Sequence, residues 1–157
     1  MNFLEQLTAE WFEYVGYFVR TNVKARKRVA GGWDMELDVL AYQPATQTLL
    51  HVEPSGDAES WAERRDRFMN KKYILSKNEY EEIIGAPIAA IERLAIVGHA
   101  KSTKADLNWG KGVEVITIAT FLSRITTYLR DIDYMSNAVP EGYPILRTIQ
   151  MVLQYED

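Results

Sequence analysis

Cysteine is absent from this chain of 157 residues, and histidine occurs only at His51 and His99. Without cysteine the chain has no disulfide framework, no thiolate zinc site and no cysteine nucleophile. Two histidines also do not supply a histidine-rich metal centre. Any metal bound by this chain is therefore expected to have oxygen ligands, which favours Mg²⁺ or Mn²⁺.

Long apolar runs are also missing, since no stretch approaches the ~20 residues that a membrane-spanning helix needs. The first residues lack the basic start and the long apolar core of a signal peptide. We therefore expect a cytoplasmic protein that does not enter a membrane. The net charge of −4 argues against a protein whose whole surface coats nucleic acid, although a local basic face is compatible with it.

The length and the ordinary content of 47% hydrophobic and 25% charged residues indicate one globular domain over 1–157. Apolar residues at helical spacing predict helices over 3–15, 58–84, 119–130 and 144–155. Alternating or continuous apolar runs predict strands over 17–28, 34–42, 48–54, 92–97 and 113–118. Asp57 is expected to cap the long helical region, which Lys77-Asn78 would divide. This order predicts an α/β fold with a central mixed sheet flanked by helices.

Two carboxylates stand out in the hairpin formed by residues 34–42 and 48–54. Asp38 lies in the middle of the first strand, and Glu53 ends the second. A carboxylate in a half-buried strand is costly unless it is paired. Two of them on adjacent antiparallel strands, within one metal's reach, are suited to a hard divalent cation. His51 shares the Glu53 face of its strand and is expected to be a hydrogen-bonded core histidine.

This order of elements and the spacing of Asp38 and Glu53 resemble the PD-(D/E)XK nuclease superfamily. The resemblance covers about residues 3–98, with further strand and helices over about 113–156. It implies a restriction-endonuclease-like α-β-β-β-α-β core and hydrolysis of phosphodiester bonds, most naturally in DNA. Asp38 and Glu53 would then be the ligands of Mg²⁺ or Mn²⁺.

The family also carries a glutamate on its first helix, which can join the metal site. Glu5 lies at the usual distance before the glycine that precedes the first strand, here Gly16, and Glu10 is the second candidate. From the residues alone, both are more typical of a solvated helix face.

One position departs from the family motif. The family has lysine two residues after the glutamate, where this chain has Ser55 after Glu53 and Pro54. A serine hydroxyl cannot supply the missing positive charge, although it could cap the turn into the next helix. That helix carries Arg65 and Lys72 on its apolar stripe, and Arg65 is the expected substitute because it lies nearer to Glu53. Arginine could neutralise phosphate but could not act as a base.

Other interpretations remain open at this point. The basic residues of the first strand, expected on one face, fit either a nucleic-acid backbone or a charged edge strand; they are Arg20, Lys24, Arg26 and Arg28. The carboxylates could instead belong to a retired site that pairs with Arg65, in a module that binds nucleic acid or protein. A homodimer or a protein partner could use the aromatic residues of the later region, which are Trp109, Tyr128, Tyr134 and Tyr143.

Overall fold

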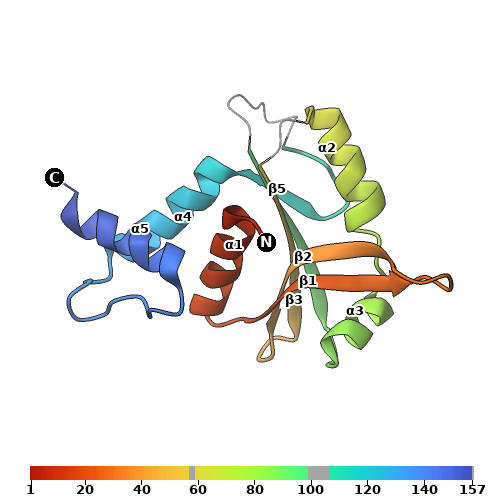
Figure 1. Ribbon diagram of the computed structural model, residues 1–157, viewed down its shortest axis with the longest axis horizontal. Coiled ribbons are helices and arrows are strands. Elements are labelled where there is room, and N and C mark those ends of the chain that lie inside the picture. Colours follow the sequence, from red (N-terminus) through yellow and green to blue (C-terminus); the bar gives the residue numbers. More distant parts are fainter. Residues whose placement is uncertain (57–58, 99–106, 157) are drawn as a thin grey trace.

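A five-stranded mixed sheet forms the centre of the molecule in the computed structural model, which describes residues 1–56, 59–98 and 107–156 (Figure 1). The strands lie in the order of the sequence: β1 (Phe18–Lys27), β2 (Trp33–Gln43), β3 (Thr48–Ser55), β4 (Ala90–Val97) and β5 (Val113–Thr117). The first three pair antiparallel, whereas β4 and β5 join in parallel. The predicted hairpin and the predicted mixed sheet are therefore confirmed.

Helices cover both faces of the sheet. One face packs against α1 (Phe3–Tyr14) and α4 (Ile118–Arg130), with α5 (Pro144–Tyr155) packed on those two helices, and the other face packs against α2 (Trp61–Arg67) and α3 (Lys77–Ile84) (Figure 1). Alternate residues of β3 divide between these layers: Leu50 and Val52 pack toward α1 and α4, while Leu49 packs toward α3. No helix in the described ranges is long and apolar enough to cross a membrane.

The long helical region predicted over 58–84 is broken into pieces. Helix α2 begins after Ser60, whose side chain accepts from the Glu63 amide at 3.2 Å, and it continues into a π-helical turn, η1 (Phe68–Lys72). The chain then leaves helical geometry over 73–76, and Ser76 caps α3 in the same way. The break therefore precedes Lys77 instead of following it, because Ser76 supplies a start signal there. The expected cap Asp57 lies outside the described residues.

Strand β1 does not keep one face along its length. Asn22 has a φ of 52°, in the left-handed region, and the pairing with β2 passes from Thr21–Val39 directly to Val23–Leu37. As a consequence Val19 packs with the α1 layer and Val23 with the α3 layer. Strict alternation would place Val19 and Val23 on one side of the sheet; it fails at Asn22, where the backbone adopts the left-handed conformation that asparagine tolerates.

Candidate active site

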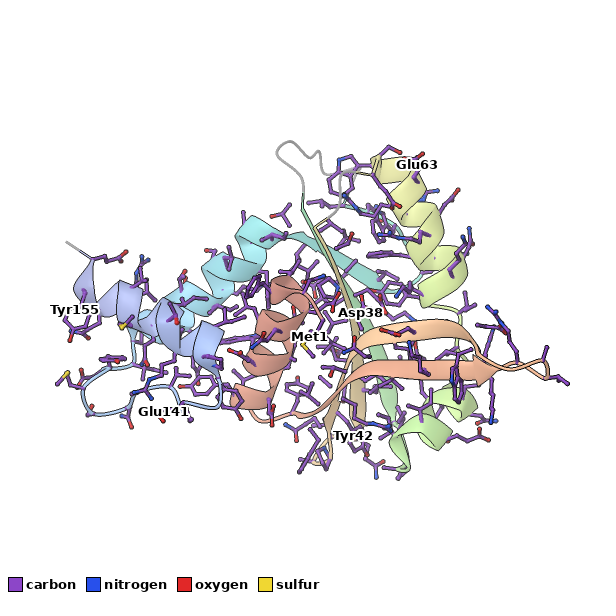
Figure 2. All side chains as sticks on the ribbon, in the orientation of Figure 1. Met1, Asp38, Tyr42, Glu63, Glu141 and Tyr155 are labelled. Carbon is purple, nitrogen blue, oxygen red and sulfur yellow. The ribbon has the colours of Figure 1, made fainter. Side chains whose placement is uncertain are left out.

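The two predicted carboxylates lie where strands β2 and β3 separate. The pairs between these strands run from Gln43–Thr48 to Val39–Val52 and end there. Beyond that point β2 stays paired with β1, and β3 stays paired with β4. Asp38 and Glu53 are the first residues past the last pair, so both carboxylates sit in the fork (Figure 2 labels Asp38).

Glu53 is buried, with 1% of its side chain exposed, and it is held by several groups. Its Oε1 accepts from His51 Nε2 at 2.7 Å and from the Asp38 amide at 3.2 Å. Its Oε2 lies 2.9 Å from Lys72 Nζ, and apart from that ion pair no described group donates to it. Burial raises the pKa of Glu53, but the His51 hydrogen bond and the Lys72 charge outweigh it and bring the pKa to about 2. This carboxylate is therefore ionised at neutral pH.

Asp38 titrates very differently. Burial, followed by the neighbouring Glu53 charge, raises the pKa of Asp38 to about 7, and the Lys72 ammonium only partly opposes this. Its Oδ1 lies 3.4 Å from Lys72 Nζ. One carboxylate of the pair is thus firmly charged, while the other is balanced between its two protonation states near neutral pH.

Lys72 brings a positive charge to the two carboxylates. Its Nζ donates to the Glu36 carbonyl at 2.8 Å and contacts both Asp38 and Glu53. Burial opposes the charged form of Lys72, but the two carboxylates raise its pKa, so it remains an ammonium. It comes from η1, and single π-helical turns are frequent at functional sites.

The structure does not support Arg65 as the substitute. Arg65 is exposed and does not line the cavity, because the buried face of α2 passes through Arg64 and Phe68 instead. Arg67 enters the cavity in its place, and its Nη2 donates to Ser55 Oγ at 3.1 Å. The hydrophobic stripe read from the sequence was therefore wrong by one residue along α2.

These groups line an open cavity of about 330 Å³. Its walls come from the start of α1, the fork between β2 and β3, and the end of the α2–η1 segment; they include Asn2, Glu5, Asp38, Glu53, Ser55, Arg67 and Lys72. Among the described residues, no cluster of three or more histidine or carboxylate side chains is placed to hold a metal ion. Asp38 and Glu53 are the carboxylates at the fork, and Glu5 is a third carboxylate in the cavity wall.

The two helix glutamates have different positions. Glu5 lines the cavity, but its oxygens accept from Asn2 at 2.7 and 3.1 Å and close a capping box at the start of α1. Glu10 is buried away from the cavity, where its Oε2 accepts from the Leu146 amide at 2.9 Å. Glu10 thus caps the start of α5, which the sequence of α1 could not show.

The basic residues of the first strand do not form one row. Arg20 and Arg26 donate to groups of α3, namely the Ile83 carbonyl at 2.6 Å and Glu79 at 2.9 Å. Lys24 forms an ion pair with Glu36, and Arg28 with Asp34. Three of the four are matched with an acid, and β1 is an edge strand of the sheet, so the charged-edge interpretation fits better than a nucleic-acid track.

The aromatic residues of the later region do not form one exposed surface. Trp109 is buried and packs edge-to-face on Phe68, with ring centroids 5.4 Å apart. Tyr128 is 48% exposed and contacts Trp11 on α1. The two side chains therefore belong to opposite layers of the molecule.

No protein-family model, curated protein or solved structure matches the chain. The function must therefore be argued from the chemistry of the site.

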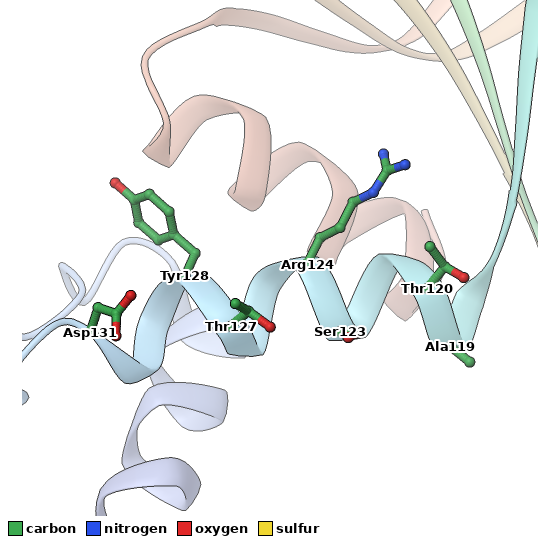
Figure 3. Close-up of a pocket in the computed structure, with 7 residues that line it drawn as sticks. All are labelled: Ala119, Thr120, Ser123, Arg124, Thr127, Tyr128 and Asp131. Carbon is green, nitrogen blue, oxygen red and sulfur yellow. The ribbon is translucent and has the colours of Figure 1, made fainter.

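A second and larger depression, of about 750 Å³, lies on the outer side of α4 (Figure 3). Hydroxyl groups of Thr120, Ser123 and Thr127 line it, together with Arg124. That arginine is neutralised by Glu114, at 2.6 Å from its Nη2. Asp131 is the carboxylate in the lining of this depression, whereas the cavity at the β2–β3 fork brings Asp38 and Glu53 together.

Proposed function

We propose that this protein is a divalent-metal-dependent nuclease that hydrolyses phosphodiester bonds in DNA. The observation that carries the proposal is the convergence of Asp38, Glu53 and Lys72 in one open cavity. Two carboxylates and an ammonium are the groups that the reaction needs from a protein: oxygen ligands for a cation, and a positive charge for the phosphate. Lys72 takes the place of the lysine that the resemblance to PD-(D/E)XK nucleases leads one to expect at Ser55.

The donor set fits Mg²⁺ or Mn²⁺. Asp38 and Glu53 would hold the ion through hard oxygen atoms, and the buried Oε2 of Glu53 is the atom with no hydrogen-bond donor beyond the Lys72 ion pair. Mg²⁺ is commonly bound through one or two carboxylates, with water and substrate phosphate completing its coordination. A third protein ligand is therefore not required.

The chemistry that the cation supplies when bound is acidification of water and polarisation of the phosphoryl oxygens. In the reaction a water oxygen forms a bond to phosphorus, the bond from phosphorus to a sugar oxygen breaks, one proton leaves the water and one is taken up by the leaving oxygen. Lys72 stabilises the negative charge that develops on the phosphate. Arg67, which lies at the same cavity wall and is paired with Glu59, would bind a neighbouring phosphate.

A second candidate function rests on the same ammonium. Lys72 lies between the carboxylates, 2.9 Å from Glu53 and 3.4 Å from Asp38, and so neutralises them without a metal. In an inactive module that binds nucleic acid or protein, Lys72 would remain paired with the two carboxylates and no metal would bind there. Metal binding and cleavage separate the two candidates.

The experiment compares wild type with Glu53→Gln and Lys72→Ala on linear, supercoiled and branched DNA and on RNA, with Mg²⁺ or Mn²⁺. Lys71→Ala is the matched control, because Lys71 is the exposed neighbour of Lys72 and its loss changes the net charge equally. We expect Glu53→Gln to abolish cleavage by weakening metal binding, and Lys71→Ala to cleave like wild type. Equal background cleavage by wild type and Glu53→Gln would refute the nuclease and favour the binding module.

A further inference from the structure

A chain of buried hydrogen bonds leads from Glu53 into the α3 layer. Glu53 Oε1 lies 2.7 Å from His51 Nε2, and His51 Nδ1 lies 2.7 Å from the Tyr80 hydroxyl. All three side chains are buried, with at most 1% exposed. Solvent therefore does not compete with these contacts, and each must be satisfied within the protein.

For a neutral imidazole, the donors and acceptors of this chain follow from the ionised carboxylate. Glu53 is ionised and can only accept, so Nε2 of His51 carries the hydrogen that it donates. Nδ1 is then an acceptor, and the Tyr80 hydroxyl donates to it. Burial raises the pKa of Tyr80 to about 12, although Arg93 acts against this, so the hydroxyl keeps its proton.

Aromatic packing holds the imidazole in place. The His51 ring meets Tyr73 and Tyr80 edge-to-face, with ring centroids 4.9 and 5.7 Å apart. The Tyr73 hydroxyl donates elsewhere, to the Leu94 carbonyl at 2.7 Å. Of these two tyrosines, Tyr80 is the one whose hydroxyl contacts a ring nitrogen of His51.

We infer that His51, oriented by Tyr80, is a positioning residue that fixes the Glu53 carboxylate. Two donors, His51 Nε2 and the Asp38 amide, hold Oε1 on the inner side. Oε2 is thereby turned toward Lys72, where a metal would be bound. The inference about metal affinity rests on the proposed function, whereas the orientation of Glu53 does not.

The orientation can be measured without metal, because the Asp38 amide donates to Glu53 Oε1. Hydrogen exchange measured by NMR gives the rate at Asp38 relative to Ala41, a buried residue within the β2 ladder. We expect Tyr80→Phe to raise this ratio about threefold or more and His51→Leu to raise it further. His51→Gln, whose amide can still donate to Glu53, should restore a ratio close to that of wild type.

Tyr42→Phe is the matched control. Tyr42 is a buried tyrosine of the same α3-side core cluster, but its hydroxyl donates to the Pro87 carbonyl at 2.7 Å, and it lies away from Asp38 (Figure 2). If the buried hydroxyls had a purely structural role, Tyr42→Phe and Tyr80→Phe would change the exchange ratio of Asp38 to Ala41 by similar amounts. An unchanged exchange ratio in both Tyr80→Phe and His51→Leu would overturn the inference, and Tyr80→Phe decides if His51→Leu does not fold.

Calorimetric titration with Mn²⁺ gives the second readout. Groups that orient a metal ligand typically change metal affinity by ~10–100-fold when removed, so His51→Leu should weaken binding to this extent and His51→Gln by only a few-fold. Wild-type affinity in His51→Leu, together with loss of binding in Asp38→Asn, would overturn positioning and leave the metal site standing. If wild type binds no Mn²⁺, the proposed function fails, and the exchange ratio still decides the role of His51.

Discussion

Replacing Asp38 with asparagine should stabilise the metal-free protein at alkaline pH. Folding raises the pKa of Asp38 from 3.8 to about 7, so the folded protein binds this proton more tightly than the unfolded chain does. The contribution of Asp38 to stability is therefore fully present below pH ~4 and is lost as the pH rises to ~7. Glu53, whose pKa is lowered to about 2, changes stability only at more acidic pH. Asparagine resembles the protonated acid at every pH.

The size of this effect follows from the difference between the two pKa values. At ~1.4 kcal/mol per pKa unit, a rise from 3.8 to about 7 corresponds to about 4 kcal/mol as an upper limit. Asp38 keeps 18% of its side chain exposed, so solvent screening reduces the expected gain to ~1–3 kcal/mol. For a chain of this length that gain raises the melting temperature by roughly 2–10 °C.

Thermal melts at pH 5 and pH 8, with and without Mn²⁺, test this reasoning. Without metal we expect the melting temperature of Asp38→Asn to be higher than that of wild type at pH 8 and closer to it at pH 5. With metal at ~100 times its dissociation constant, wild type should gain ~2.7 kcal/mol and the variant nothing, so the lead of Asp38→Asn at pH 8 should disappear or reverse. Asp34→Asn, on the same strand but paired with Arg28 outside the cavity, is the control. A difference between Asp38→Asn and wild type that is independent of pH would refute the argument.

Two further predictions concern the charged groups on either side of the sheet. Glu10→Ala should lower stability by ~1–3 kcal/mol in chemical denaturation, because the buried Leu146 amide loses its acceptor, whereas Glu13→Ala, exposed on the same helix, should have little effect. If the nuclease proposal is correct, Lys72→Ala should reduce the cleavage rate at saturating metal by ~10²–10³-fold, and Lys71→Ala should leave it unchanged. Equal cleavage rates in the two variants would show that Lys72 takes no part in the reaction.

The hairpin and its carboxylates could be predicted because their signals are local. Alternation over 34–42 and 48–54 and the proline-containing turn between them define the pairing of the two strands. The proximity of Asp38 and Glu53 follows from that pairing. The positively charged partner of these carboxylates was predicted only in part, because the stripe named both Arg65 and Lys72 and favoured Arg65, whereas Lys72 is the one that contacts both carboxylates. An ideal helix favours Arg65, whereas the buried face runs through Arg64 and Lys72 is carried by a π-helical turn that sequence periodicity does not reveal.

Two other differences depend on contacts between distant segments. The role of Glu10 depends on the Leu146 amide, 136 residues away, so nothing in the first helix announces it. The face change in β1 depends on the left-handed backbone of Asn22, a conformation that asparagine tolerates but does not require. In both cases the local pattern predicted the helix or strand correctly but not the residues that its side chains contact.

The charged groups of the candidate site come from two kinds of element, namely strands of the central sheet and a short helical segment outside it. Asp38 and Glu53 belong to inner strands of the sheet, which at the fork remain paired on their outer sides with β1 and β4. Lys72 ends a short helical segment that is joined to α3 through four non-helical residues, 73–76. A displacement of that segment would carry the ammonium away and leave the carboxylates where they are. In the proposed nuclease such a displacement would free both carboxylates for a cation and would at the same time remove the positive charge that faces the phosphate.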